Sequence, residues 1–172
     1  MEKKFLCVMA GYDDNTEQYL VDLQNKLYQK DFIGTHTKDL PQHITLGTFP
    51  VEEETELIDL VTRVSREIKP FDITFNHIGI FNGSKVLFVA PDPNSCLFKL
   101  KEKFGDSYNW TPHTTMLIDE SVIYSALPYL ADNFKSFQGS IQNIHLYEFW
   151  PTRHILSLSF EENKNRESEL KD

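Results

Sequence analysis

The sequence predicts an α+β fold built from two matching halves, and three observations support this prediction. Segments of alternating apolar and polar residues, typical of strands, are interspersed with segments of helical spacing along the 172 residues. Two pairs of strand-like segments are separated by short connections, as in antiparallel hairpins. The order helix, strand containing a histidine, helix, hairpin occurs twice.

The first half is expected to begin with a strand from Phe5 to Tyr12. A helix follows, with Asn15 or Thr16 as its expected N-cap and apolar residues at helical spacing. Its next strand lies within LPQHITLGTFP, at 40–50. The remaining elements are a helix at 51–68, acidic at its start and basic at its end, and a hairpin of strands 71–81 and 85–90 around Asn82-Gly83-Ser84.

The second half begins near residue 94 and repeats this order. Its expected elements are a helix from Cys96 to Phe104, a strand at 111–119, a helix at 121–134 that Pro128 kinks or divides, and a hairpin of 136–149 and 154–161. Lys69-Pro70-Phe71 matches Lys135-Ser136-Phe137, and the following apolar positions match at the same offset of 66 residues. We therefore expect one duplicated domain at 1–160 and a charged flexible tail at 161–172.

Each half carries a histidine with a threonine two residues later, which places both side chains on one face of a strand. His43 and Thr45 form the first such pair, whereas Ile44, Leu46 and Thr48 are expected on the opposite face. The second pair is His113 and Thr115. His43 corresponds to His113 in the repeat, and the stretch between the histidine and the matching Lys-x-Phe segment is four residues shorter in the second half. Of the histidines at 36, 43, 77, 113, 145 and 154, only these two have Ser or Thr at that spacing, so the other four are expected to be structural or exposed.

Two histidines facing one groove suit in-line displacement at phosphorus. Imidazole has a pKa near 6.5, so a neutral ring can take a proton from the attacking oxygen while a charged ring protonates the leaving oxygen. The hydroxyls of Thr45 and Thr115 can hydrogen-bond the non-bridging phosphate oxygens. A metal site is not expected, since zinc takes three or four closely spaced ligands and no such cluster occurs near either motif.

These motifs resemble those of the two-histidine (2H) phosphoesterases, which include the 2′-5′ RNA ligase-like cyclic phosphodiesterases. The resemblance rests on HIT at 43–45, HTT at 113–115 and the hairpin NHIGIF with KVLFVAP at 76–91, and it covers the chain apart from the tail. Thr114 departs from the pattern, which usually has an apolar residue there. The resemblance implies two pseudo-symmetric lobes with antiparallel sheets around a central groove, helices outside, metal-free catalysis without a cofactor, and 2′,3′-cyclic phosphates or 2′-5′ linkages as substrates.

Several further side chains are candidates for binding substrate. An aromatic ring can stack on any base, and a cation at the start of a hairpin strand can reach a phosphate. The candidates are Tyr12, Phe81, Trp110, Tyr147 and Trp150 for stacking, with Lys85 and Arg153 for phosphate.

Composition limits the partners. A net charge of −9, from 26 acidic and 17 basic residues, argues against a DNA duplex and favours a small nucleotide or an RNA 3′ end. The apolar run near the N-terminus is short for a signal peptide, no segment has the length of a membrane span, and Cys7 and Cys96 are expected to be core residues. We expect a cytoplasmic monomer without membrane attachment.

Three alternatives to a cyclic phosphodiesterase stay open at this point. The same acid and base groups run in reverse would ligate RNA through a 2′-5′ linkage. The domain could bind nucleotides or RNA ends with little turnover, or serve a purely structural role. The sequence leaves open which histidine is the acid and which ribose oxygen departs.

Overall fold

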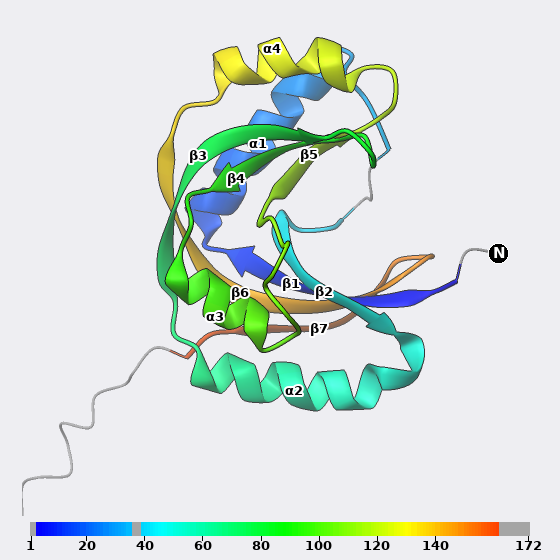
Figure 1. Ribbon diagram of the computed structural model, residues 1–172, viewed down its shortest axis with the longest axis vertical. Coiled ribbons are helices and arrows are strands. Elements are labelled where there is room, and N and C mark those ends of the chain that lie inside the picture. The colour runs from blue at the N-terminus through cyan, green and yellow to red at the C-terminus, as the bar shows by residue number, and fades with distance from the viewer. Residues whose placement is uncertain (1–2, 36–38, 162–172) are drawn as a thin grey trace, which may run out of the picture.

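The computed structural model describes residues 3–35 and 39–161 (Figure 1). Its elements follow the predicted order. The strands are β1 (Phe5–Tyr12), β2 (His43–Pro50), β3 (Phe71–Phe81), β4 (Val86–Pro91), β5 (Thr114–Ile118), β6 (Phe137–Phe149) and β7 (Arg153–Ser159). The helices are α1 (Asp14–Gln29), α2 (Glu54–Glu67), α3 (Ser95–Glu102) and α4 (Ile123–Asn133), with a 3₁₀ turn at Val51–Glu53.

The described strands form one antiparallel sheet in the order β2-β1-β6-β3-β4-β5. The long strand β6 joins its two parts. Along one edge β6 pairs with β1, and along the other it pairs first with β3 and then with β7. The sheet curves so strongly that its edge strands β2 and β5 come into contact, as Figure 1 illustrates. This contact brings the two histidine motifs to one place.

When the chain is divided before β4 instead of near residue 94, the elements form two series of the same order, β1-α1-β2-α2-β3 and β4-α3-β5-α4-β6. The third strand of each series pairs with the first strand of the other, since β3 pairs with β4 and β6 pairs with β1. The predicted α+β class with antiparallel strands and outer helices is confirmed, with the difference that the two lobes share one continuous sheet. The duplication itself and the domain limits stay predictions.

The two faces of the sheet have different packing. All four helices contribute to a single core on one face, together with alternate residues of β1 such as Leu6 and Val8. The other face carries two small apolar clusters. One contains Cys7, Met9, Tyr147 and Phe149, and the other contains Val86, Phe88 and Ala90 with Phe81 against them. Each small cluster lies beside one histidine motif, so this face forms the walls of the candidate site.

Three local predictions are wrong in whole or in part. Asp13, not Asn15 or Thr16, is the N-cap of α1, because its carboxylate accepts hydrogen bonds from the backbone N–H groups of both later residues. Pro128 does not divide α4, which continues as one helix from Ile123 to Asn133, and a kink at this residue stays a prediction. Cys96 is exposed, whereas Cys7 is buried as expected.

The predicted tail beyond Glu161 and His36 lie outside the described residues. Within the described part of the chain, no helix is long and apolar enough to span a bilayer.

Candidate active site

The first motif lies at the start of β2. As expected, Ile44 and Leu46 are buried in the core while His43 and Thr45 lie on the opposite face. The prediction for Thr48 is wrong, because Thr48 does not lie beside Ile44 but lines the same cavity as Thr45. A β-bulge explains the difference, because the pairing with β1 skips one residue between Thr45 and Gly47 and thereby reverses the later side chains.

A chain of buried hydroxyls connects the two motifs. The Thr114 hydroxyl donates a hydrogen bond to the backbone carbonyl of His43 at 3.1 Å, and the Tyr12 hydroxyl also contacts the Thr114 oxygen. Since threonine has one hydroxyl hydrogen, Tyr12 is the donor in the second bond. Thr114, which departs from the family pattern, therefore links β1, β2 and β5 directly under the site.

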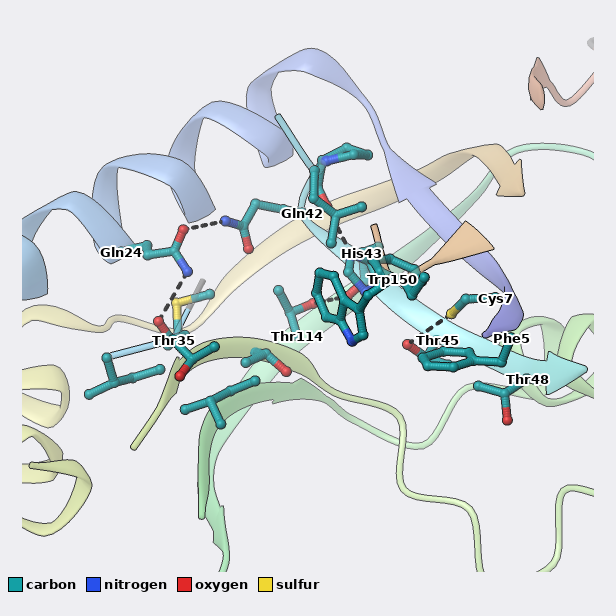
Figure 2. A pocket seen from close by; sticks show the side chains of 17 residues that line it. Phe5, Cys7, Gln24, Thr35, Gln42, His43, Thr45, Thr48, Thr114 and Trp150 are labelled. Atoms are coloured by element: carbon teal, nitrogen blue, oxygen red, sulfur yellow. Dashed lines mark hydrogen bonds between the residues drawn. The ribbon is translucent and has the colours of Figure 1, made fainter. Parts of the chain in front are cut away.

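An amide bridge supports the same junction from the other side. The side chain of Gln42 donates to Gln24 on α1 at 2.9 Å, and Gln24 donates to the backbone carbonyl of Met116 on β5 at 3.0 Å (Figure 2). The residue before His43 is thus tied to the second motif strand through a helix. These bonds hold the two edge strands in a defined relation without a sheet ladder between them.

The two imidazoles are oriented in the same way. Nδ1 of His43 donates to the carbonyl of Pro41, and Nδ1 of His113 donates to the carbonyl of Thr111, both at 2.8 Å. A carbonyl only accepts, so Nδ1 carries the proton in each ring and Nε2 is left as the reactive nitrogen. Each motif therefore sets the tautomer of its histidine through the backbone two residues earlier.

Both histidines favour the neutral form. Burial lowers the pKa of His43 below 6.5, the bond to Pro41 opposes this shift, and the charge of His113 lowers the pKa further. The last effect requires the two rings to lie close together. Burial also lowers the pKa of His113, whose ring packs against Phe81 and Phe88 at centroid distances of 4.7 and 5.2 Å.

A cavity of about 340 Å³ adjoins the motifs (Figure 2). His43, Thr45 and Thr115 line it, whereas His113 does not, although Thr114 and Thr115 directly follow it in the chain. The opposite wall is aromatic and includes Phe5, Phe149 and Trp150. The cavity thus combines polar groups at the motifs with an aromatic surface.

Three of the five aromatic candidates pack within the protein and do not face the cavity. Tyr12 and Tyr147 are only 3% and 8% exposed, so neither ring is free to stack on a base. Trp110 packs against Phe98 and donates its indole N–H to the carbonyl of Thr45 at 3.2 Å. Trp110 therefore supports β2 instead of facing the cavity.

The other two aromatic candidates lie at the site. Phe81 packs on the edge of the His113 ring, which limits that ring's freedom. Trp150 is 45% exposed and lines the cavity. Trp150 is the candidate that has both the exposure and the position needed to stack on a base.

Neither cationic candidate is placed to bind phosphate. Arg153 is ion-paired with Glu54 and Glu148 and does not line the cavity at the motifs. Lys85 donates to Asn82 in the β3–β4 turn and to the hydroxyl of Tyr124 on α4, and it does not line the cavity. Carboxylates therefore neutralise Arg153, whereas Lys85 is hydrogen-bonded to neutral groups outside the cavity.

Sequence reasoning missed the contribution of β1 to the site. Phe5 and Cys7 line the cavity, and the Cys7 thiol lies 4.0 Å from the Thr45 hydroxyl. Burial raises the pKa of Cys7 to about 11, so the thiol stays protonated and is not a nucleophile. Alternation places Phe5 and Cys7 on one face, but only the pairing with β2 determines that this face is the site.

The sequence predicts no metal site. Among residues 3–35 and 39–161, no three His, Cys, Asp or Glu side chains converge as ligands. Nδ1 of each motif histidine is bonded to a carbonyl, which leaves Nε2 for other contacts. The arrangement has the groups needed for proton transfer and for hydrogen bonding to an anion.

An α+β fold that brings two His-x-Thr motifs together at one groove defines the class of the two-histidine phosphoesterases. The sequence profile of the 2′-5′ RNA ligase superfamily matches residues 13–149, and the chain belongs to this family. No curated protein is significantly similar to the chain in sequence.

Solved structures share this fold at low sequence identity. E. coli LigT complexed with ATP has a TM-score of 0.64 at 18% identity, over 94% of this chain and 100% of that chain. LigT complexed with 3′-AMP has a TM-score of 0.62 at 16% identity over the same shares. TT0787 of Thermus thermophilus has a TM-score of 0.62 at 15% identity, over 92% of this chain and 99% of that chain.

Proposed function

We propose that this protein is a metal-independent phosphodiesterase that hydrolyses 2′,3′-cyclic phosphates of nucleotides or RNA ends by general acid–base catalysis with His43 and His113. The observation that carries the proposal is the matched pair of Nδ1–carbonyl hydrogen bonds, which leaves Nε2 of each ring free for proton transfer. Family membership and the effect of the His113 charge on the pKa of His43 support it.

In the proposed reaction one neutral Nε2 accepts a proton from water as the water oxygen attacks phosphorus. The other ring, protonated, gives its proton to the departing ribose oxygen, so the proton balance is restored after one exchange with solvent. Thr45 and Thr115 donate hydrogen bonds to the non-bridging oxygens, where negative charge is held in the transition state. Each histidine is expected to contribute about 10²–10⁴-fold to the rate.

The cavity favours a nucleotide as the substrate. The aromatic wall with Trp150 offers a face for a base beside the polar motif residues. LigT, which shares the fold, is described in complexes with ATP, phosphate and 3′-AMP. We further propose that the protein acts as a cytoplasmic monomer on short substrates.

A phosphodiesterase assay on the four 2′,3′-cyclic nucleotides in EDTA tests the proposal. Wild type is compared with His43→Ala and His113→Ala, and with His77→Ala as a matched control, since His77 is an exposed histidine paired with Asp92. We expect turnover in EDTA that falls at least about 100-fold in either motif variant and not in the control.

The position of the phosphate in the product identifies the departing oxygen. A strict requirement for a divalent cation, or full activity in either motif variant, would contradict the proposal. Binding of nucleotides by the wild type without any turnover would favour the alternative of a binding module.

A further inference from the structure

A third histidine, His145, lies on the same face of the sheet as His43. His145 pairs with Met9 on β1, and Met9 pairs in turn with Thr45 on β2, so the three residues form one row across the strands. The proposed mechanism does not use His145, and its sequence context has no threonine two residues later.

The backbone at Gly11 makes room for this ring beside His43. Gly11 lies on β1 between His43 on β2 and Asn143 on β6. A Cβ at Gly11 would come within 2.2 Å of Nε2 of His145, so the imidazole occupies the space that a side chain would otherwise fill. His145 therefore leans over β1 toward His43 instead of standing above its own strand.

The opposite edge of the ring is held by the β6–β7 hairpin. Nδ1 of His145 lies 2.7 Å from the Ser157 hydroxyl, and Nε2 of His154 lies 2.8 Å from the same oxygen. The Ser157 hydroxyl can donate to one ring while it accepts from the other. This bond fixes the ring through Nδ1 and leaves Nε2 over Gly11, on the side of the sheet where His43 lies.

His145 lies between the apolar cluster, where it adjoins Met9 and Tyr147, and a strip of polar, uncharged groups on β6 and β7. Burial, followed by the charges of His43 and His154, lowers the pKa of His145 to about 4, so the ring is neutral at pH 7. The nearest strands contribute amide and hydroxyl groups from Asn143, Ser157 and Ser159. A neutral polar strip of this kind suits an uncharged hydroxyl better than a second phosphate.

We propose that His145 is a substrate-binding residue whose Nε2 hydrogen-bonds a sugar hydroxyl of the nucleotide next to the phosphate held by His43. This inference rests on the proposed function. It extends the site from the two motifs across Gly11 to the β6–β7 hairpin and predicts that this hairpin takes part in recognising ribose.

Two amide substitutions separate this role from a structural one. In His145→Gln the side-chain amide replaces Nε2 and loses the Ser157 bond, whereas in His145→Asn it replaces Nδ1 and loses the group that lies over Gly11 beside His43. The measurements are kcat/KM on 2′,3′-cyclic AMP and the Kd of 3′-AMP by calorimetry, with thermal melting as a check on folding. His77→Asn is the matched control.

We expect His145→Asn to lower kcat/KM and raise Kd about 5–10-fold, the size of one lost hydrogen bond, and His145→Gln to stay within about twofold of wild type. The opposite order, or equal values in both variants, overturns the inference in favour of a structural role. If the wild type binds 3′-AMP without turning over any cyclic nucleotide, the proposed function fails while the order of Kd values still decides the role of His145. Absence of both binding and turnover in the wild type overturns both.

Discussion

The hydroxyl chain beneath the site leads to a prediction about Thr114. In Thr114→Val the side chain keeps its shape but loses the group that donates to the His43 carbonyl and accepts from Tyr12. Thr114 is 1% exposed, so water cannot replace these bonds. The substitution therefore tests whether a hydroxyl at this position holds the two motif strands together.

The expected cost has two parts. Loss of the bond to the His43 carbonyl costs about 1 kcal/mol, and the buried Tyr12 hydroxyl left without its acceptor costs about 1–3 kcal/mol more. The free energy of unfolding should fall by about 2–4 kcal/mol, which lowers Tm by roughly 4–16 °C for a domain of this size. Activity should also fall at temperatures where the variant is folded, because His43 loses a contact that positions its backbone.

Urea denaturation of four proteins measures the effect: wild type, Thr114→Val, Tyr12→Phe and the double variant. Tyr12→Phe removes the orphaned group, so the double variant should be more stable than the sum of the two single changes predicts. Strict additivity, or a cost below about 0.5 kcal/mol for Thr114→Val, would refute the reasoning. The single variant Tyr12→Phe, which keeps the bond between Thr114 and His43, serves as the control for activity.

Three further predictions concern the motif histidines, the contact between Gly11 and His145, and Arg153. Burial lowers the pKa of both His43 and His113 below 6.5, so kcat/KM should be highest on the acidic side of pH 6.5. It should decrease as the pH rises, because the histidine that acts as the acid loses its proton. An optimum above about pH 7.5 in a pH–rate profile would contradict this expectation. Gly11→Ala should lower kcat/KM about as much as His145→Ala does, since the added methyl displaces the ring; steady-state kinetics that show full activity in Gly11→Ala would argue against the close contact. Arg153→Ala should keep kcat/KM within roughly twofold, since the guanidinium is paired with carboxylates; a loss of about 100-fold would restore Arg153 as a phosphate ligand.

Local pattern was sufficient for most elements. Alternation in β2 identified which of its first residues face the core, because successive side chains of a strand point to opposite faces. The same rule failed at Thr48, where the bulge adds one residue to the strand. The start of α1 was predicted less accurately, because Asp13, Asn15 and Thr16 are all suitable N-cap residue types and the sequence does not rank them.

Side-chain availability could not be predicted from residue type. Tyr12 and Trp150 are both aromatic, but one is enclosed at a junction of three strands and the other is exposed at the cavity. Arg153 is cationic, but carboxylates from α2 and β6 neutralise it. These outcomes depend on contacts between residues distant in the chain, about which local spacing carries no information.

The amino-acid sequence alone determined the α+β class, the repeated order of elements and the two His-x-Thr pairs, because each depends on periodicity or on residues within a few positions of one another. The tertiary structure decided that β6 pairs with β1 and β3, that β2 and β5 meet, and that Thr114 and His145 lie beside His43. Such features arise from long-range pairing and sheet curvature. A strand's alternation indicates which residues share a face, but not which other strand, or which other histidine, that face will meet.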